Sequence, residues 1–99
     1  MEVVSSFFEG RVRLRAEIFK DNIVINEVSD ILDNVKGVTD YQFNSNTGSL
    51  LIEYDTIKLP FLKIKKSLPL LEAIKKMYEE DFTIEEIRPY INKLKDILI

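Results

Sequence analysis

The sequence predicts an α+β domain, because strand-like and helix-like patterns alternate along its 99 residues. Polar and apolar side chains alternate near the start of the chain, which is the period of a half-buried strand. Later segments carry apolar residues three and four positions apart, which is the period of an amphipathic helix. Turn-forming residues at 45–48 separate two further strand-like segments. A chain of this length is expected to form one domain with one core.

The first strand is predicted within residues 3–19. Three arginines occupy one parity of this segment and three small or apolar residues occupy the other: Arg11, Arg13 and Arg15 against Val12, Leu14 and Ala16. Successive side chains of a strand point to opposite faces of a sheet. The strand is therefore expected to have one apolar face and one charged face.

A helix is predicted over residues 22–36. Asp21 precedes it and can cap it by accepting a backbone N–H bond. Its apolar stripe consists of Val24, Val28, Ile31 and Val35. Gly37 stands where a glycine would close the helix. Two strands joined by a hairpin turn, at 38–44 and 49–55, complete the order strand, helix, strand, strand.

From Leu59 the chain reads as helical, with two alternatives for its boundaries. Pro60 suits the first turn of a helix. Pro69 would disrupt that helix if it ran unbroken to Met77, because a proline ring clashes with the carbonyl four residues earlier. Alternatively, Ser67 caps a fresh helix that runs to about Tyr78.

The last helix is predicted to open on a capping box formed by Thr83 and Glu86. Pro89 is expected to bend this helix or to delay its start. Its apolar stripe consists of Ile84, Ile87, Ile91, Leu94 and Leu98. We therefore expect a domain over residues 1–79 and a helical extension over 80–99, packed on that domain or on a partner. Monomer and homodimer both fit this pattern.

Two motifs at a consistent separation resemble a known family. Residues 9–15 (EGRVRLR), followed by a helix, Gly37-Val38 and residues 46–55 (NTGSLLIEYD), resemble a cysteine-free branch of the heavy-metal-associated domain superfamily. The likeness covers about residues 3–77. It implies a ferredoxin-like βαββα(β) sandwich, here with an additional C-terminal helix.

The sequence departs from the superfamily in two places. Metal-carrying members place a Cys-x-x-Cys pair between the first strand and the first helix, where this chain has residues 19–22 (FKDN) and no thiol. The chain contains no cysteine and no histidine, so the family's thiolate mechanism does not carry over. The fourth strand is the second departure: its only candidate is residues 81–84, so it is expected to be short or missing. The open edge of the first strand would then pair with another chain or be covered by the terminal helix.

The resemblance implies a non-catalytic binding or interaction module. Similar cysteine-free domains occur at the N-termini of P-type cation ATPases and in small proteins associated with iron transport and iron storage. An enzyme is not expected, since no histidine is available as a base and the three glycines are isolated. No cofactor and no metal are expected. The start of the chain does not read as a signal peptide and no run is long enough to span a membrane, so a cytoplasmic location is expected.

The row of Arg11, Arg13 and Arg15 is the candidate binding site. Guanidinium groups bind carboxylate and phosphate with two hydrogen bonds, so the row could receive a phosphorylated ligand, a lipid head group, an RNA backbone or an acidic partner. The alternative interpretation is a solvated sheet face in which the arginines pair with nearby acids. The candidate acids are three at facing positions and two on the parity of the arginines: Glu53, Asp55 and Asp40, with Glu9 and Glu17. A small regulator that binds nucleic acid or an anionic ligand through this face is the alternative function, although the net charge of −3 makes nucleic acid the weaker choice.

Two further charged groups remain as candidates. A lysine cluster could face an anionic membrane or nucleic acid, or could be the solvated side of a helix: Lys58, Lys63, Lys65 and Lys66, with Lys75 and Lys76 beyond. Acidic residues on the first helix and near the third could hold a hard cation, although none has EF-hand spacing: Asp30, Asp33, Glu79, Glu80, Asp81, Glu85 and Glu86.

Overall fold

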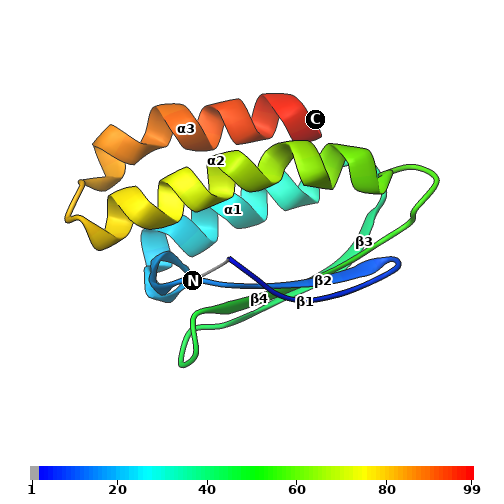
Figure 1. Cartoon of the computed structure of the whole chain (residues 1–99), viewed down its shortest axis with the longest axis horizontal. Helices are drawn as coiled ribbons and strands as arrows, with labels where there is room; N and C mark the ends of the chain where they lie inside the picture. Colours follow the sequence, from blue (N-terminus) through cyan, green and yellow to red (C-terminus); the bar gives the residue numbers. More distant parts are fainter. Residues whose placement is uncertain (1–2) are drawn as a thin grey trace.

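The computed structural model describes residues 3–99 and arranges them in two layers, a sheet and a layer of helices (Figure 1). The elements follow in the order β1 (Val4–Phe8), β2 (Arg11–Arg15), a short 3₁₀ helix η1 (Glu17–Lys20), α1 (Asn22–Asp33), β3 (Val38–Asn44), β4 (Ser49–Tyr54), α2 (Phe61–Glu79) and α3 (Ile84–Leu98). All three α-helices lie on the same side of the sheet, so the opposite face of the sheet carries no helix (Figure 1).

The sheet has four antiparallel strands in the order β1-β2-β4-β3. This confirms the α+β class, and the arrangement is compatible with a ferredoxin-like fold. Arg13 at the middle of β2 stands opposite Ser6 of β1 and Leu51 of β4. The apolar side chains of β2 point the other way, and Val12 and Leu14 are buried beneath the helices.

The prediction of one long first strand is wrong, because residues 4–15 form a hairpin. A two-residue turn at Glu9 and Gly10 reverses the chain between β1 and β2. Gly10 adopts a φ of 81°, a left-handed conformation that glycine accepts without strain. Its carbonyl oxygen accepts a hydrogen bond from the Tyr54 amide at 2.9 Å, which ties the turn to the end of β4. Alternation alone does not distinguish a strand from a tight hairpin.

This hairpin also corrects the expectation of an open strand edge. β1 pairs along β2 and covers the edge that was expected to meet another chain or the terminal helix. Within residues 3–99 no strand follows α2, and Thr83 caps α3 instead of belonging to a strand. The N-terminal strand β1 therefore occupies the edge beside β2 that a missing last strand was expected to leave open.

Helix α1 begins as predicted and ends early. The Asp21 carboxylate accepts the Ile23 amide at 2.9 Å, which confirms the N-cap. The helix ends at Asp33, three residues before the predicted Lys36, so Gly37 lies in the following turn and does not close it. Asn34 ends the helix because its backbone leaves the helical region and its side-chain amide donates to the Asp30 carbonyl at 2.8 Å.

Helix α2 runs unbroken through Pro69, so the alternative of a fresh helix capped by Ser67 is wrong. The Ser67 hydroxyl instead donates to the Ile64 carbonyl at 2.6 Å. Ile64 and Ile74 are buried on either side of the proline, and their burial holds the two halves of the helix in line. Helix α3 begins at Ile84 with the predicted capping box, so Pro89 does not delay its start.

The core lies between the sheet and the helices. Leu50 from the sheet, Val24 from α1 and Ile87 from α3 are almost completely buried within it. Ile91 and Leu94 extend the contribution of α3, which lies along α2 (Figure 1). The predicted stripe of the last helix is thus packed on the domain itself. Within the described residues, no helix is long and apolar enough to cross a membrane.

Candidate functional site

The predicted arginine row lies on the uncovered face of the sheet. β2 holds Arg11, Arg13 and Arg15 at alternate positions, and all three side chains are exposed. Because β2 lies between β1 and β4, the row is central to this face and not at its edge. The helices are on the other side of the sheet (Figure 1), so a ligand can approach the row from solvent.

The three arginines differ in their neighbours across the sheet. Arg11 stands opposite Glu53, and Glu53 in turn stands opposite Asp40 of β3. Arg13 stands opposite Leu51 and Arg15 opposite Ser49. One end of the row is therefore flanked by acids and the other end by neutral residues.

The alternative interpretation required ion pairs between the row and nearby acids. Among residues 3–99, no carboxylate lies within 4.0 Å of these three guanidinium groups. Glu17 pairs with Lys20 at 3.2 Å. Asp55 accepts the amides of Ile57 and Lys58 at 2.8 and 3.2 Å, and these bonds lower the pKa of its carboxyl group. The two acids therefore serve other contacts.

Arg13 and Arg15 border a shallow depression of about 540 Å³ on the sheet face. The remaining lining consists of neutral residues from β1, β3, β4 and the β3–β4 turn: Ser5, Ser6, Gln42, Asn44, Thr47, Ser49 and Leu51. Hydroxyl and amide groups there can donate hydrogen bonds to an anion, and no carboxylate belongs to the lining. The depression suits carboxylate or phosphate oxygens better than a cation.

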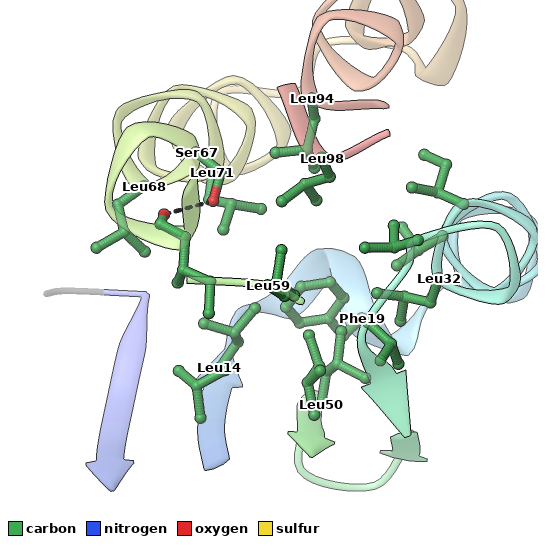
Figure 2. Close-up of a pocket in the computed structure, with 17 residues that line it drawn as sticks. Leu14, Phe19, Leu32, Leu50, Leu59, Ser67, Leu68, Leu71, Leu94 and Leu98 are labelled. Carbon is green, nitrogen blue, oxygen red and sulfur yellow. Dashed lines mark hydrogen bonds between the residues drawn. The ribbon is translucent and has the colours of Figure 1, made fainter. Parts of the chain in front are cut away.

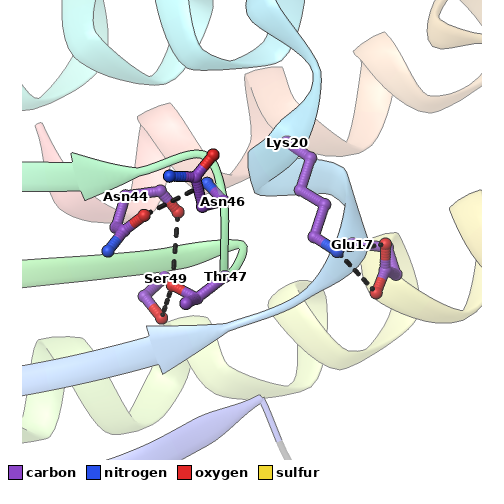
Figure 3. A network of polar contacts seen from close by, with 6 residues as sticks. All are labelled: Glu17, Lys20, Asn44, Asn46, Thr47 and Ser49. Carbon is purple, nitrogen blue, oxygen red and sulfur yellow. Dashed lines mark hydrogen bonds and ion pairs between the residues drawn. The ribbon is translucent and has the colours of Figure 1, made fainter.

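The β3–β4 turn at the rim of the depression is held by its own side chains (Figure 3). The Thr47 hydroxyl donates to Ser49 Oγ at 2.8 Å and lies 3.4 Å from the Asn44 carbonyl oxygen. The Asn44 side-chain oxygen accepts the Asn46 amide at 3.1 Å. These bonds position Thr47, Ser49 and Asn44 before any ligand arrives.

The segment that corresponds to the family's metal-ligand loop does not fit a soft metal ion. Phe19 is buried in the core, Lys20 is bonded to Glu17 (Figure 3), and Asp21 caps α1. No thiol or imidazole stands there or elsewhere in the chain. In the described part of the chain, no group of three or more potential ligands is arranged to hold a metal ion.

The lysine cluster divides into two parts. Lys75 and Lys76 on the second half of α2 pair with Glu79 and Glu80 one turn later, at 3.0 and 4.0 Å. The Lys76–Glu80 pair is the solvated pair expected on the outer side of a helix, whereas the Lys75 side chain is only 12% exposed. Lys58 precedes α2, whereas Lys63, Lys65 and Lys66 belong to its first half.

The acidic candidates are scattered over the fold. The Asp33 carboxylate accepts the Tyr41 hydroxyl at 2.6 Å, and this bond raises the pKa of Tyr41. Glu86 belongs to the capping box, and Glu85 lies beside it in the first turn of α3. The structure therefore does not bring the acids of the first and third helices into one site.

A cavity of about 60 Å³ lies in the core between sheet and helices (Figure 2). Leucines from both layers surround it, and Ser67 is the one polar side chain in its lining. The Ser67 hydroxyl is already bonded to a backbone carbonyl. The cavity is therefore a packing defect of an apolar core, without groups to orient a polar ligand.

Sequence reasoning found the arginines but missed the rest of the depression. Ser5 and Ser6 join it only because residues 4–8 fold back as β1. Gln42 and Asn44 stand opposite Leu51 and Ser49, at the polar positions of the alternating β3 segment. Their alternate positions in the sequence indicate that they share one face of the strand. Only the order of the strands in the sheet places that face beside Arg13 and Arg15.

Comparison with known proteins gives one match. A family model described as heavy metal associated domain 2 matches residues 1–97. No curated protein matches the chain, and no solved structure does.

Proposed function

The chain belongs to the heavy metal associated domain 2 family, and from this premise we propose that it is a non-catalytic module that binds an acidic segment of a partner protein. The proposed binding surface is the part of the uncovered sheet face around Arg13 and Arg15. The observation that carries the proposal is the state of these two arginines. Both are exposed, both face neutral residues across the sheet, and neither has a carboxylate partner within residues 3–99.

The spacing of the two arginines matches an extended acidic segment. Alternate residues of a strand are about 6.5 to 7 Å apart, both in β2 and in an extended ligand. Carboxylates two residues apart in the partner can therefore meet Arg13 and Arg15 at the same time. The neutral hydroxyl and amide groups around them supply further donors without repelling the ligand.

Nucleic acid fits this surface less well than an acidic peptide does. Glu53 and Asp40 flank the Arg11 end of the row, so the unopposed positive charge is limited to two side chains. A phosphate backbone is usually followed by a longer basic stripe on a basic domain, whereas this chain has a net charge of −3. A small regulator of that kind remains the alternative.

We further propose that the domain is not an enzyme and that it acts beside a metal-handling system. We assign no enzymatic activity, since the chain has neither histidine nor cysteine to act as base or nucleophile. From the resemblance of residues 9–15 and 46–55 to cysteine-free domains, we propose a role beside a cation-transporting ATPase or an iron-handling system in the cytoplasm. In this role the domain contacts a protein partner and does not carry metal on thiolates, since the chain has no cysteine. A homodimer would be an alternative partner arrangement.

Binding of a synthetic peptide with alternating glutamates tests the proposal. Wild-type protein should bind it, and affinity should fall as salt screens the charges. Arg13→Glu together with Arg15→Glu should reduce affinity by about tenfold or more, since each like-charge contact replaces an attraction. Thermal stability should be almost unchanged, because both side chains are exposed.

The control is Lys93→Glu together with Lys95→Glu, which makes an equal charge change on exposed residues of α3, the helix farthest from this face (Figure 1). It should leave affinity almost unaltered. Equal loss of binding in both variants would mean that net charge and not the sheet face determines affinity. Tighter binding of single-stranded RNA than of the peptide would favour the alternative function.

A further inference from the structure

Large apolar side chains gather, exposed, at one end of the molecule, and the sheet-face proposal does not use them. Phe8 at the end of β1 is 70% exposed, Ile57 in the β4–α2 loop is 89% exposed, and Leu62 in the first turn of α2 is 61% exposed. Phe7 and Phe61 are also partly exposed beside them. Apolar side chains in such a group, unlike single ones, indicate a surface that contacts something other than water.

Packing between the hairpin and the helix brings Phe7 and Phe61 together, whereas Phe8, paired opposite Arg11, points to the other face of the hairpin. The rings of Phe7 and Phe61 lie 4.6 Å apart between their centres and join β1 to the start of α2. The β1–β2 turn is bonded to the end of β4 through Gly10 and Tyr54. Figure 1 shows the β1–β2 turn, the β4–α2 loop and the start of α2 at the same end of the molecule. We call this end the apolar tip and define it by Phe7, Ile57, Phe61 and Leu62.

The loop that presents Ile57 has a defined shape. The Asp55 carboxylate accepts the amides of both Ile57 and Lys58, as in an Asx turn. The Leu59 amide donates to the Asp55 carbonyl at 2.8 Å, and Leu59 itself is buried. Ile57 thus projects from a short loop that is anchored at both of its ends.

Four lysines accompany the apolar tip. Residues 56–71 contain Lys58, Lys63, Lys65 and Lys66 and no acidic residue. Within the described residues, none of these lysines has a carboxylate within 4.0 Å. Four acids stand near this end, and three of them already have partners or a facing cation: the Asp55 carboxylate accepts backbone amides, Glu53 stands opposite Arg11, and Glu72, beside Phe7 and Phe61, accepts the Val3 amide. The fourth is Glu9 in the β1–β2 turn. Positive charge therefore predominates on the segment 56–71 that carries Ile57, Phe61 and Leu62.

We propose that the apolar tip docks the domain on an anionic lipid surface. Aromatic and aliphatic side chains can enter the boundary between headgroups and acyl chains, while lysines on long stems reach the lipid phosphates. Each lysine near an anionic bilayer adds attraction, and four of them act together here. Charge complementarity favours this occupant over a second copy of the chain, because two copies would bring eight unpaired lysines together.

Sedimentation with lipid vesicles tests this inference. The full chain should sediment with phosphatidylcholine vesicles that contain about one third phosphatidylserine, and it should remain in solution with phosphatidylcholine alone. Ile57→Asp should weaken binding by about tenfold, because it removes an inserted apolar group and adds repulsion. Lys63→Glu together with Lys66→Glu should abolish the dependence on phosphatidylserine.

Ile23→Asp is the matched control, since Ile23 is also an exposed isoleucine but lies in the first turn of α1. It should bind vesicles as the wild type does, and circular dichroism should show all variants folded. Lack of sedimentation of the wild type, or equal sedimentation of the Ile57 and Ile23 variants, would overturn the inference. A dimer that Ile57→Asp dissociates in analytical ultracentrifugation would also overturn it, because a second copy would then cover the tip.

Discussion

At the scale of single residues, the arginine row separates into unequal members. Arg11 stands opposite Glu53, so part of its charge is offset across the sheet. Arg13 and Arg15 have neutral neighbours and border the depression. The sequence predicts that all three share a face, because strand parity is visible in it. Which arginine stands opposite an acid depends on the register between β2 and β4. The alternation of residues within one strand does not determine that register.

Asp55 provides a prediction on pH dependence. Two backbone amides stabilise its carboxylate and lower its pKa in the folded protein. A lowered pKa means that its contribution to stability is present above the pKa of the unfolded chain and is lost as the pH falls through the folded-state pKa. An NMR titration of the Asp55 carboxyl carbon should therefore have its midpoint below that of aspartate in an unfolded peptide.

The amides of Ile57 and Lys58 should shift with the same midpoint, because they donate to this carboxylate. Asp55→Asn removes the titrating group and keeps an acceptor oxygen, so those shifts should disappear in the variant. A midpoint at or above the peptide value would contradict the bonded geometry.

At the scale of elements, the N-terminal hairpin is the main difference between the sequence prediction and the structure. Residues 38–44 and 49–54 match their predicted strands closely, because each is bounded by turn residues. The two caps at Asp21 and Thr83 were also predicted correctly, since capping depends on local chemistry. β1 was missed because its pairing with β2 depends on a two-residue turn within a continuous alternating segment.

Val3 and Phe8 test the structural role of this added strand. Val3, which precedes β1, is 1% exposed, and its amide donates to the Glu72 carboxylate of α2. Val3→Ala should lower the free energy of unfolding by about 2 kcal/mol, from lost burial and the cavity left behind. Phe8→Ala, at the exposed end of the strand, should change it by less than about 0.5 kcal/mol. Urea denaturation measures both. Equal effects would mean that the strand does not pack as described.

At the scale of the whole molecule, the two proposed surfaces lie at different places. The depression beside Arg13 and Arg15 adjoins the β3–β4 turn, whereas the apolar tip surrounds the β1–β2 turn and the start of α2 (Figure 1). The helical layer supports both, because α2 carries part of the tip and packs on the sheet. A domain built this way can meet an acidic partner while it is docked elsewhere.

The division into a domain over residues 1–79 and an extension over residues 80–99 stays a prediction. The packing of helix α3 suggests how to test it. Ile87 is completely buried in the same core as residues of the sheet. Ile87→Ala should therefore lower the free energy of unfolding of the entire domain by about 3 kcal/mol and retain a single cooperative transition. Ile99→Ala, on an exposed residue after the same helix, is the control and should have little effect. Two separate transitions would instead support an independent extension.

The most direct test of the proposed function is an NMR map of amide shifts in the full chain during titration with the glutamate peptide. The proposal predicts that the largest shifts occur in residues 13–15 of β2, residues 49–51 of β4 and the β3–β4 turn, and that they diminish at high salt. The amide chemical shifts of the apolar tip and of α3 should not change during the titration. Shifts that concentrate on the lysines of α2, with β2 unchanged, would contradict the assignment of the arginine face as the binding surface.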